Sequence, residues 1–369
     1  MASRADENNR YSRQVALPAF GEGAQAKLRH AHVLVVGAGG LGCATLPYLA
    51  AAGVGTIRIV DPDTVALSNL PRQILYNEVD VGQFKAVQAA AHLRKLNSAI
   101  QVTAHPAALT RENALTHIRD VDCVIDATDR FPARYLINDA CVLLNKPFIY
   151  GSIHQYEGQL AVFNWQGSPT YRDLFPLPPA PESIPTCETG GVLGPLAGVV
   201  GAWQAIEAIK ILAGLPAGLA GRLLVYDSLS HEQRIIQVPD RNQRAVVTNL
   251  IDYDFFCSPK VATGMKEVTV TELKAMMDSH ADFQLIDVRE PHEYEICNLQ
   301  GELIPLSQVP HHLDQIARDK KVVVHCRSGG RSGNIIQWLE KNRGLTNLYN
   351  LKGGILAWAA EIDPSMPAY

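Results

Sequence analysis

The segment from His325 to Ser332 is the part of the chain best suited to hold a negatively charged sulfur atom, and it reads His-Cys-Arg-Ser-Gly-Gly-Arg-Ser. The apolar residues Val322 to Val324 predict a strand that delivers Cys326 to its tip. Gly329 and Gly330 allow the following backbone to curl, so that successive N–H groups point at the sulfur. Such a nest of N–H groups stabilises a thiolate.

Positive charge is expected around the same sulfur. Arg327 and Arg331 bring cations, and Ser332 is expected to open a helix over residues 334–341 whose N-terminus favours the thiolate further. A buried structural cysteine beside a surface turn is the plainer interpretation, but it explains neither the glycines nor the arginines. We call residues 326–332 the sulfur loop, which contains Cys326, Arg327, Ser328, Gly329, Gly330, Arg331 and Ser332.

A second site is indicated in the first half, where four glycines follow an apolar strand at residues 32–36. Gly37, Gly39, Gly40 and Gly42 form a G-x-G-x-x-G turn that opens an Ala- and Leu-rich helix ending near residue 53. Such a turn lets phosphates approach a helix N-terminus, and Asp61, which ends the next strand, can accept hydrogen bonds from ribose hydroxyls. This pattern suits NAD as well as ATP.

Polar residues beyond the glycine turn favour ATP. A triphosphate needs extra cations and an oxygen ligand for magnesium, which Arg72, Lys85 and Asp129 would supply. Taken singly, Lys85 could be a solvated helix residue, Asp129 a helix N-cap and Arg72 a weak surface ion pair. The predicted nucleotide site comprises Gly37, Gly39, Gly40, Gly42, Asp61, Ser68, Asn69, Arg72, Gln73, Lys85, Asp129 and Arg130.

The pattern of elements that must position both sites is α/β in each half. Residues 1–250 are expected to form a nucleotide-binding domain with a largely parallel sheet, residues 251–266 a linker, and residues 267–369 a smaller α/β domain. The stretch 158–164 predicts an antiparallel strand, and the proline-rich stretch 167–185 predicts an extended connection. Further helices are expected at 85–97, 194–213 and 270–279, and further strands at 56–60, 101–104, 122–125, 221–227, 233–238, 283–287 and 322–325.

Size and composition exclude several other classes of protein. With 369 residues, 19% of them charged, and a net charge of −4, the chain has room for two domains but no cationic footprint for nucleic acid. The polar first ten residues do not resemble a secretion signal, and no stretch approaches 18 uncharged apolar residues, so we expect a cytoplasmic protein without membrane spans. Seven scattered cysteines fit reduced thiols.

Residues 11–238 resemble the MoeB/ThiF family of ubiquitin-activating-like adenylyltransferases. The motifs that carry this resemblance are Arg10 to Gln14, the glycine turn, Val60-Asp61, Ser68-Asn69-Leu70, Arg72-Gln73, Lys85, Asp126 to Asp129, Arg134-Tyr135, and Cys187 ahead of Gly190 to Gly194. The resemblance implies a Rossmann-like domain with a mixed sheet. It implies that, in this domain, the C-terminal glycine carboxylate of a ubiquitin-like sulfur-carrier protein attacks the α-phosphate of ATP. It also implies that Arg13 reaches into the partner subunit's site in a homodimer.

This chain departs from the family pattern at two places. Arg130 stands where the family usually has Asn after the magnesium-binding Asp, here Asp129. Many relatives bind a structural zinc with two C-x-x-C pairs, but Thr170 and Asp173 replace the first pair and only Cys257 remains near the second. Zinc prefers four thiolate or imidazole ligands, so we predict no zinc site.

Residues 267–369 resemble a single rhodanese domain through Ile286 to Pro291, Glu293-Tyr294, the sulfur loop, and Gly353 to Trp358, with Gln300-Gly301 in place of the usual Pro-Gly. This resemblance implies that Cys326 carries a persulfide, received from thiosulfate or from a cysteine desulfurase. Cys187 matches the family's second cysteine, which could form an acyl thioester, resolve a disulfide intermediate, or be structural.

The fused halves lead to one main hypothesis. One half makes an electrophilic acyl-adenylate and the other carries nucleophilic sulfur, so we expect carrier adenylation followed by sulfur transfer that yields a thiocarboxylate. The alternatives are an NAD-dependent oxidoreductase with an appended sulfur domain, a carrier-binding scaffold whose ATP site has decayed, and a rhodanese that acts alone on thiosulfate.

Overall fold

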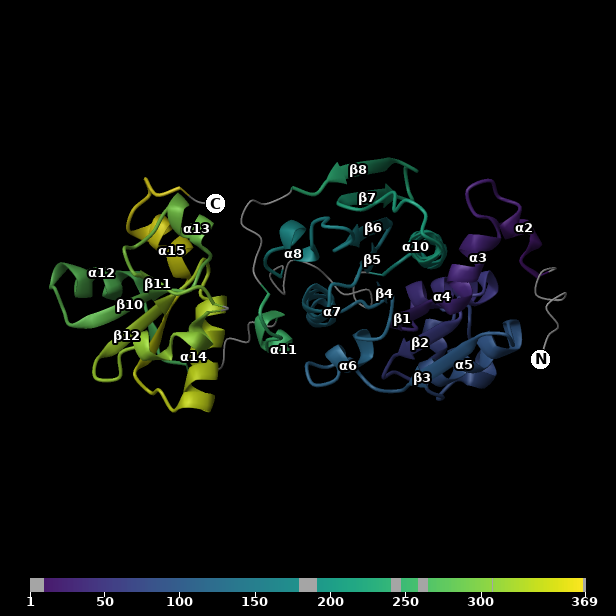
Figure 1. The fold of residues 1–369 in the computed structure, drawn as a ribbon. Coiled ribbons are helices and arrows are strands. Elements are labelled where there is room, and N and C mark those ends of the chain that lie inside the picture. Colours follow the sequence, from purple (N-terminus) through teal and green to yellow (C-terminus); the bar gives the residue numbers. More distant parts are fainter. Residues whose placement is uncertain (1–9, 179–190, 240–246, 258–264, 307, 368–369) are drawn as a thin grey trace. The chain divides into compact units, whose positions relative to one another are not determined.

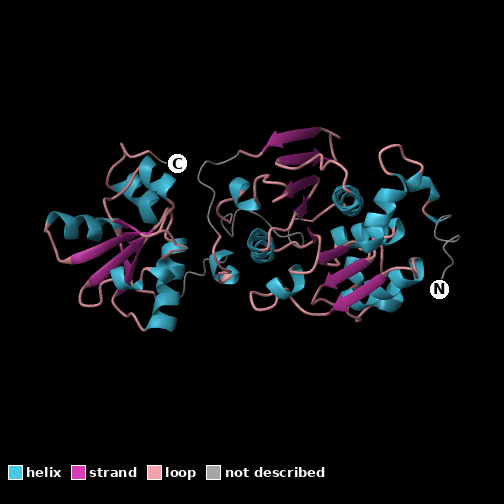
Figure 2. Cartoon of the chain, in the orientation of Figure 1, coloured by secondary structure: helices cyan, strands magenta, loops and turns pink. Residues whose placement is uncertain are grey.

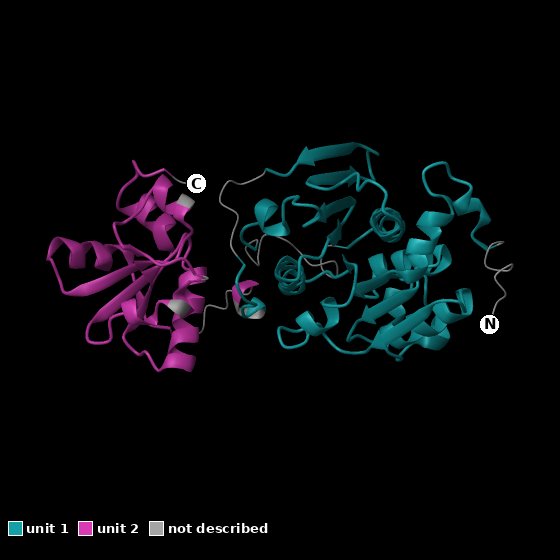
Figure 3. Cartoon of the chain, in the orientation of Figure 1, with its two compact units in different colours: residues 1–253 teal, residues 254–369 magenta. Residues whose placement is uncertain are grey.

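The computed structural model describes residues 10–178, 191–239, 247–257, 265–306 and 308–367. The chain divides into two compact units, residues 1–253 and residues 254–369 (Figure 3). Each unit carries its own sheet (Figure 2). Cys187 lies outside the described residues.

The first unit is built on an eight-stranded mixed sheet with the order β3-β2-β1-β4-β5-β6-β7-β8 (Figure 1). In this order, the strands β3, β2, β1, β4 and β5 run parallel to one another. Strands β6, β7 and β8 continue the sheet beyond β5, and each pairs antiparallel with its neighbour. The strand bounds are β1 His32–Val36, β2 Thr56–Val60, β3 Gln101–His105, β4 Cys123–Asp126, β5 Phe148–His154, β6 Glu157–Phe163, β7 Arg222–Asp227 and β8 Gln233–Gln237.

Two groups of helices pack beside this sheet. One group comprises α3, α4, α5 and α10, and the other comprises α6, α7 and α8. By length and composition α10 could cross a membrane, but 61% of its apolar window is buried inside the protein, as expected of a core helix. The helix bounds are α2 Ser12–Val15, α3 Gly21–His30, α4 Gly40–Ala52, α5 Lys85–Leu96, α6 Ala114–Ile118, α7 Phe131–Leu143, α8 Tyr171–Leu174 and α10 Gly194–Ala213. Helix α11, Tyr253–Cys257, begins at the last residue of this unit.

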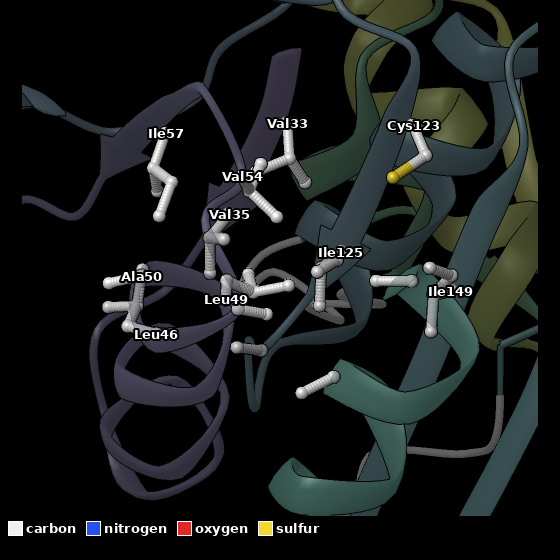
Figure 4. Close-up of a cluster of buried hydrophobic side chains, with 14 of the residues drawn as sticks. Val33, Val35, Leu46, Leu49, Ala50, Val54, Ile57, Cys123, Ile125 and Ile149 are labelled. Atoms are coloured by element: carbon white, nitrogen blue, oxygen red, sulfur yellow. The ribbon is translucent and has the colours of Figure 1, made fainter. Parts of the chain in front are cut away.

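The core of the first unit lies between the central strands and α4. Val33, Val35 and Ile57 of the strands face Leu46 and Leu49 of α4, and all five are fully buried (Figure 4). Burying one such side chain contributes about 1.5–3 kcal/mol. Strands β1 and β4 are buried on both sides, which explains why they read as nearly continuous apolar runs.

The second unit has a five-stranded, wholly parallel sheet with the order β11-β10-β12-β13-β9. Its core joins Leu273 of α12, Val323 of β12, Leu351 of β13 and Trp358 of α15. The bounds are β9 Glu267–Val268, α12 Val270–Asp278, β10 Phe283–Asp287, α13 Pro291–Ile296, β11 Glu302–Leu303, β12 Lys321–His325, α14 Gly330–Arg343, β13 Leu348–Leu351 and α15 Gly354–Glu361.

The fold class expected from the sequence is confirmed, with local corrections. The proline-rich stretch is not wholly extended, because α8 forms within it and buries Tyr171. A short helix, α11, begins inside the predicted linker. Helix α14 begins at Gly330 rather than at Asn334, so Ser332 lies buried in its first turn and does not precede it.

Candidate active sites

A cavity of about 200 Å³ lies where β1, β2 and β4 end, at the carboxyl edge of the parallel strands. This is the edge at which open α/β sheets bind ligands. The predicted nucleotide residues that line it are Gly37, Gly39, Gly40, Asp61, Asn69, Arg72, Gln73, Lys85, Asp129 and Arg130. The structure therefore brings together residues from five separate stretches of the sequence.

The glycine turn is required by close packing at the floor of this cavity. Gly37 has φ +99°, and a Cβ there would lie 2.5 Å from the carbonyl oxygen of Ala127. Gly42 does not line the cavity, and a Cβ on it would lie 2.3 Å from the carbonyl oxygen of Gly37. The turn brings the N-terminus of α4, which starts at Gly40, to the cavity, where its free N–H groups can bind phosphate.

Asp61 and Lys85 are both buried at the cavity. The Asp61 carboxylate accepts hydrogen bonds from the backbone N–H of Ala38 at 2.6 Å and of Asp63 at 2.8 Å, while burial raises its pKa. The Lys85 side chain is 8% exposed, and its Nζ lies 3.0 Å from the Asp63 carboxylate. Lys85 is therefore not a solvated helix residue.

Several other predicted residues of the nucleotide site are more exposed than Asp61 and Lys85. Arg72 donates from its guanidinium to the carbonyl oxygen of Ser68 at 3.2 Å, and Ser68 itself is exposed and does not line the cavity. Asp129 is exposed at the cavity, and the N-cap of α7 is Arg130, so the N-cap interpretation of Asp129 is wrong.

Asp126 and Arg134 form a buried pair that the sequence analysis did not assign to the site. Burial raises the pKa of Asp126 to about 6, although Arg134, whose Nε lies 3.4 Å from Oδ2, lowers it. The Arg134 guanidinium lies over the rings of Phe131 and Tyr150 and lines the cavity. The sequence pointed to Arg134 only through the Arg134-Tyr135 motif of the family resemblance, and this motif did not indicate that Arg134 pairs with Asp126 or lines the cavity.

In the second unit, the sulfur of Cys326 is held inside the sulfur loop and is almost wholly buried. Its Sγ accepts a hydrogen bond from the N–H of Gly329 at 3.2 Å, and the Ser332 hydroxyl lies 3.4 Å away. The first N–H groups of α15 bind the other side of the loop, because Ile355 N donates to the Cys326 carbonyl at 3.0 Å. Gly354 is required there, since it has φ +59° and a Cβ would lie 2.5 Å from that carbonyl oxygen.

The two arginines of the loop differ in their surroundings. Arg327 is exposed, as is Ser328. Arg331 donates two hydrogen bonds of 2.7 Å to the carboxylate of Glu293 in α13. Burial by itself would raise the pKa of Glu293, but the hydrogen bonds and charge of Arg331 hold it below its ordinary value. The positive charge expected from Arg331 is therefore balanced by Glu293.

A buried charged network lies behind the sulfur loop. Asp287 and Arg289, both fully buried, form a bidentate ion pair, and the Nε2 of His325 lies 3.6 Å from the Asp287 carboxylate. Burial lowers the pKa of His325 to about 4. His325 is therefore neutral at physiological pH.

The two positions compared above with a zinc-binding cysteine pair, Thr170 and Asp173, hydrogen-bond to each other. The Asp173 carboxylate accepts hydrogen bonds from the N–H and hydroxyl of Thr170, which closes the first turn of α8. Two further residues, Arg172 and Tyr253, donate to the buried carboxylate of Asp139. Over the described residues, no group of three His, Cys, Asp or Glu side chains is placed to hold a metal ion. The donors that are present do not fit zinc, and the absence of zinc stays a prediction.

Two separate regions of the chain match known protein families. Residues 11–247 match the ThiF family and residues 269–361 match the rhodanese-like domain. The first unit also resembles crystal structures of MccB from E. coli. The structure with ATP has a TM-score of 0.58 and 23% identity, and the match covers 66% of this chain and 75% of that one. At this identity the likeness shows the fold.

Relatives match over almost the whole chain. MoeZ of Mycobacterium tuberculosis, described as a probable adenylyltransferase/sulfurtransferase, is 42% identical over 99% of this chain and 96% of its own length. MOCS3 of Mus musculus, an adenylyltransferase and sulfurtransferase, is 41% identical over 99% of this chain and 88% of its own. This chain therefore belongs to the ThiF family, as an adenylyltransferase and sulfurtransferase whose second unit is a rhodanese-like domain.

Proposed function

We propose that this protein adenylates the C-terminal glycine of a ubiquitin-like sulfur-carrier protein and then converts that carboxylate into a thiocarboxylate. The observation that carries the proposal is that one chain joins a cation-lined cavity at a helix N-terminus to a buried cysteine held by hydrogen-bond donors. The cations that line the cavity are Arg72, Lys85, Arg130 and Arg134.

In the first step, the carrier carboxylate attacks the α-phosphorus of ATP and pyrophosphate leaves. The N-terminus of α4 and the cations hold the phosphates, because fixed dipoles and charges stabilise the charge that spreads over the phosphate oxygens. Lys85 is already desolvated, and its partner Asp63 is exposed, so exchanging that carboxylate for a phosphate oxygen costs little. Asp61 accepts hydrogen bonds from the ribose.

In the second step, sulfur reaches Cys326 and then the carrier. The Cys326 thiolate attacks the outer sulfur of a donor, thiosulfate or a desulfurase persulfide, and the donor leaves as sulfite or thiolate. The outer sulfur of the Cys326 persulfide then attacks the acyl carbon of the adenylate and expels AMP, which gives an acyl disulfide. A thiol, from Cys187 or from an external reductant, attacks Sγ of Cys326 and releases the thiocarboxylate, leaving a disulfide on Cys326. One further external thiol reduces this disulfide when the first thiol was external, and two external thiols reduce it when the partner is Cys187.

Magnesium and a second subunit complete the proposed site. Asp129 fits a magnesium role, because Mg²⁺ in such sites takes one or two carboxylates and completes its shell with phosphates and water. When bound, it would neutralise charge on the triphosphate. Arg13 is exposed on α2, which suits a residue that serves the partner subunit's site in a homodimer. The need for ATP and reduced thiols supports the cytoplasm as the place of action.

Carrier-dependent exchange of pyrophosphate into ATP tests the first step. Lys85→Met should lower this exchange by at least tenfold, whereas Lys95→Met, an exposed residue of the same helix, should leave it unchanged. Cys326→Ala should also leave it unchanged, because the sulfur loop takes no part in adenylation. Exchange that does not require any carrier protein, or that survives Lys85→Met in full, would sink the proposal.

A further inference from the structure

The hydrogen bonds around Cys326 depend on a serine that has only one proton to give. The Ser332 hydroxyl lies 2.7 Å from Oδ1 of Asn350, 3.2 Å from the carbonyl oxygen of Gly329 and 3.4 Å from Sγ of Cys326. A hydroxyl donates one hydrogen bond and accepts with its lone pairs. Ser332 is fully buried, so the three neighbours compete for that proton.

The shortest of the three contacts decides the direction of the proton. With the amide oxygen of Asn350 at 2.7 Å, the serine proton points to Asn350, and Ser332 presents a lone pair to the sulfur. A lone pair suits a protonated thiol, which can donate its S–H. It repels a thiolate or a persulfide anion, which needs a donor.

Asn350 can reverse this direction without moving its backbone. Rotating the amide by half a turn places its NH₂ group where the oxygen stands, so that Asn350 donates to Ser332 and Ser332 donates to the sulfur. The backbone of Asn350 is fixed by its pairing with Val324 of β12 and by its N–H bond to Lys266. The side chain is nearly fully buried, so water does not replace either partner.

We infer that Asn350 is a positioning residue for sulfur transfer. Its amide sets whether Ser332 accepts from the Cys326 thiol or donates to the thiolate and to the persulfide. The inference rests on the proposed role of Cys326 as the sulfur carrier of this chain. Asn350 lies 18 residues after Ser332 in the sequence. It is brought next to Ser332 because its strand, β13, pairs with β12, the strand that leads into the sulfur loop.

The inference is tested by titrating the ultraviolet absorbance of the Cys326 thiolate in the full chain, with the spectrum of Cys326→Ala subtracted. One hydrogen bond to a charged group is worth about 1.5–3 kcal/mol, which corresponds to about one to two pH units, and the long 3.4 Å contact between Ser332 and Cys326 favours the lower value. We expect Ser332→Ala to raise the titration midpoint by about one unit and Asn350→Leu to raise it by roughly half a unit to one unit. The double variant should match Ser332→Ala alone, because Asn350 acts only through the serine.

Additive shifts in the double variant, or no shift with Asn350→Leu, would overturn the inference. Asn350→Asp keeps the shape of the side chain and covers the case in which Asn350→Leu does not fold. Because a carboxylate only accepts, it holds the serine proton away from the sulfur, and its effect should shrink in the Ser332→Ala background. An equal effect in both backgrounds would refute the relay.

This readout separates the inference from the proposed function. The midpoint reports thiolate formation and does not require a carrier or ATP, so a thiocarboxylate assay can fail while the titration succeeds. The charged and titratable groups around the loop are Asp287, Arg289, Glu290, Glu293, His325, Arg327 and Arg331. They stay the same in Ser332→Ala and Asn350→Leu, whereas Asn350→Asp adds one carboxylate, whose direct repulsion of the thiolate is present in both serine backgrounds.

Discussion

Replacing Arg172 by Met should destabilise the first unit strongly, because Arg172 neutralises a carboxylate that water does not reach. Asp139 is 2% exposed, and it accepts hydrogen bonds of 2.7 and 2.8 Å from the Arg172 guanidinium. Removing one partner of a buried ion pair costs about 3–5 kcal/mol, since the other charge stays buried. The hydroxyl of Tyr253 at 2.8 Å would remain as a donor, which places the loss toward the lower end of that range.

The measurement is thermal unfolding of the full chain, monitored by hydrogen exchange so that the unfolding of each unit is measured separately. For a unit of this size a loss of 1 kcal/mol lowers Tm by about 2–4 °C, so Arg172→Met should lower it by roughly 10 °C. The matched control is Arg58→Met, which breaks a more exposed pair with Asp120 and should cost at most about 1 kcal/mol. Equal shifts in the two variants would refute the reasoning.

The same buried group bears on the predicted absence of zinc. The hydrogen bond from Tyr253 to Asp139 ties the end of the first unit to α7. Tyr253→Phe removes this hydrogen bond to a charged group and should lower the free energy of unfolding by about 1.5–3 kcal/mol. Because the clamp of Asp139, Arg172 and Tyr253 needs no metal, a chelator should leave the Tm of the first unit unchanged. One tightly bound zinc per chain would contradict this account.

Three further outcomes are expected. Glu293→Gln should lower the stability of the second unit by about 2 kcal/mol, because it leaves the Arg331 charge without its partner, while Glu295→Gln on the same helix should have no effect on denaturant unfolding. His325 has a pKa of about 4 in the folded chain against an ordinary 6.5, so between these pH values the unfolded state binds a proton that the folded state does not. Stability should therefore fall as pH drops from about 6.5 to 4, by up to about 1.4 kcal/mol per pH unit. His325→Gln should make the free energy of unfolding less dependent on pH in this range, as measured by denaturant unfolding at several pH values. Arg134→Met should leave Asp126 buried without its cation and raise its pKa further above about 6, which nuclear magnetic resonance titration of the carboxyl would detect.

The fold was largely predictable because its signals are local. The strand at 32–36, the glycine turn and the helix after it follow from consecutive apolar residues and from glycines at fixed spacing. The start of α14 was misplaced because Gly330 and Gly333 are poor helix formers, and tertiary packing of the loop overrides that propensity. Helix α8 was missed because prolines on both sides obscured its short capping box.

The contacts that tune the sites were not predictable in the same way. Asn350 meets Ser332, and Asp139 meets Tyr253, only because strands and helices far apart in the sequence are packed together. The sequence of the loop shows the charge of Arg331, but its partner Glu293 comes from another helix, so the balance of charge could not be inferred from the loop. Residue types indicated the chemistry, whereas the hydrogen-bond partners required the fold.

The intact mass of a carrier protein that ends in glycine tests the central claim most directly. The carrier is incubated with the full chain, ATP, Mg²⁺ and thiosulfate. We expect replacement of one carboxyl oxygen by sulfur with the wild-type chain and with Cys297→Ala, a control cysteine that is half-buried in the same unit. With Cys326→Ala we expect pyrophosphate release and the carrier acyl-adenylate but no thiocarboxylate. Thiocarboxylate formed by Cys326→Ala at the wild-type rate would contradict the account.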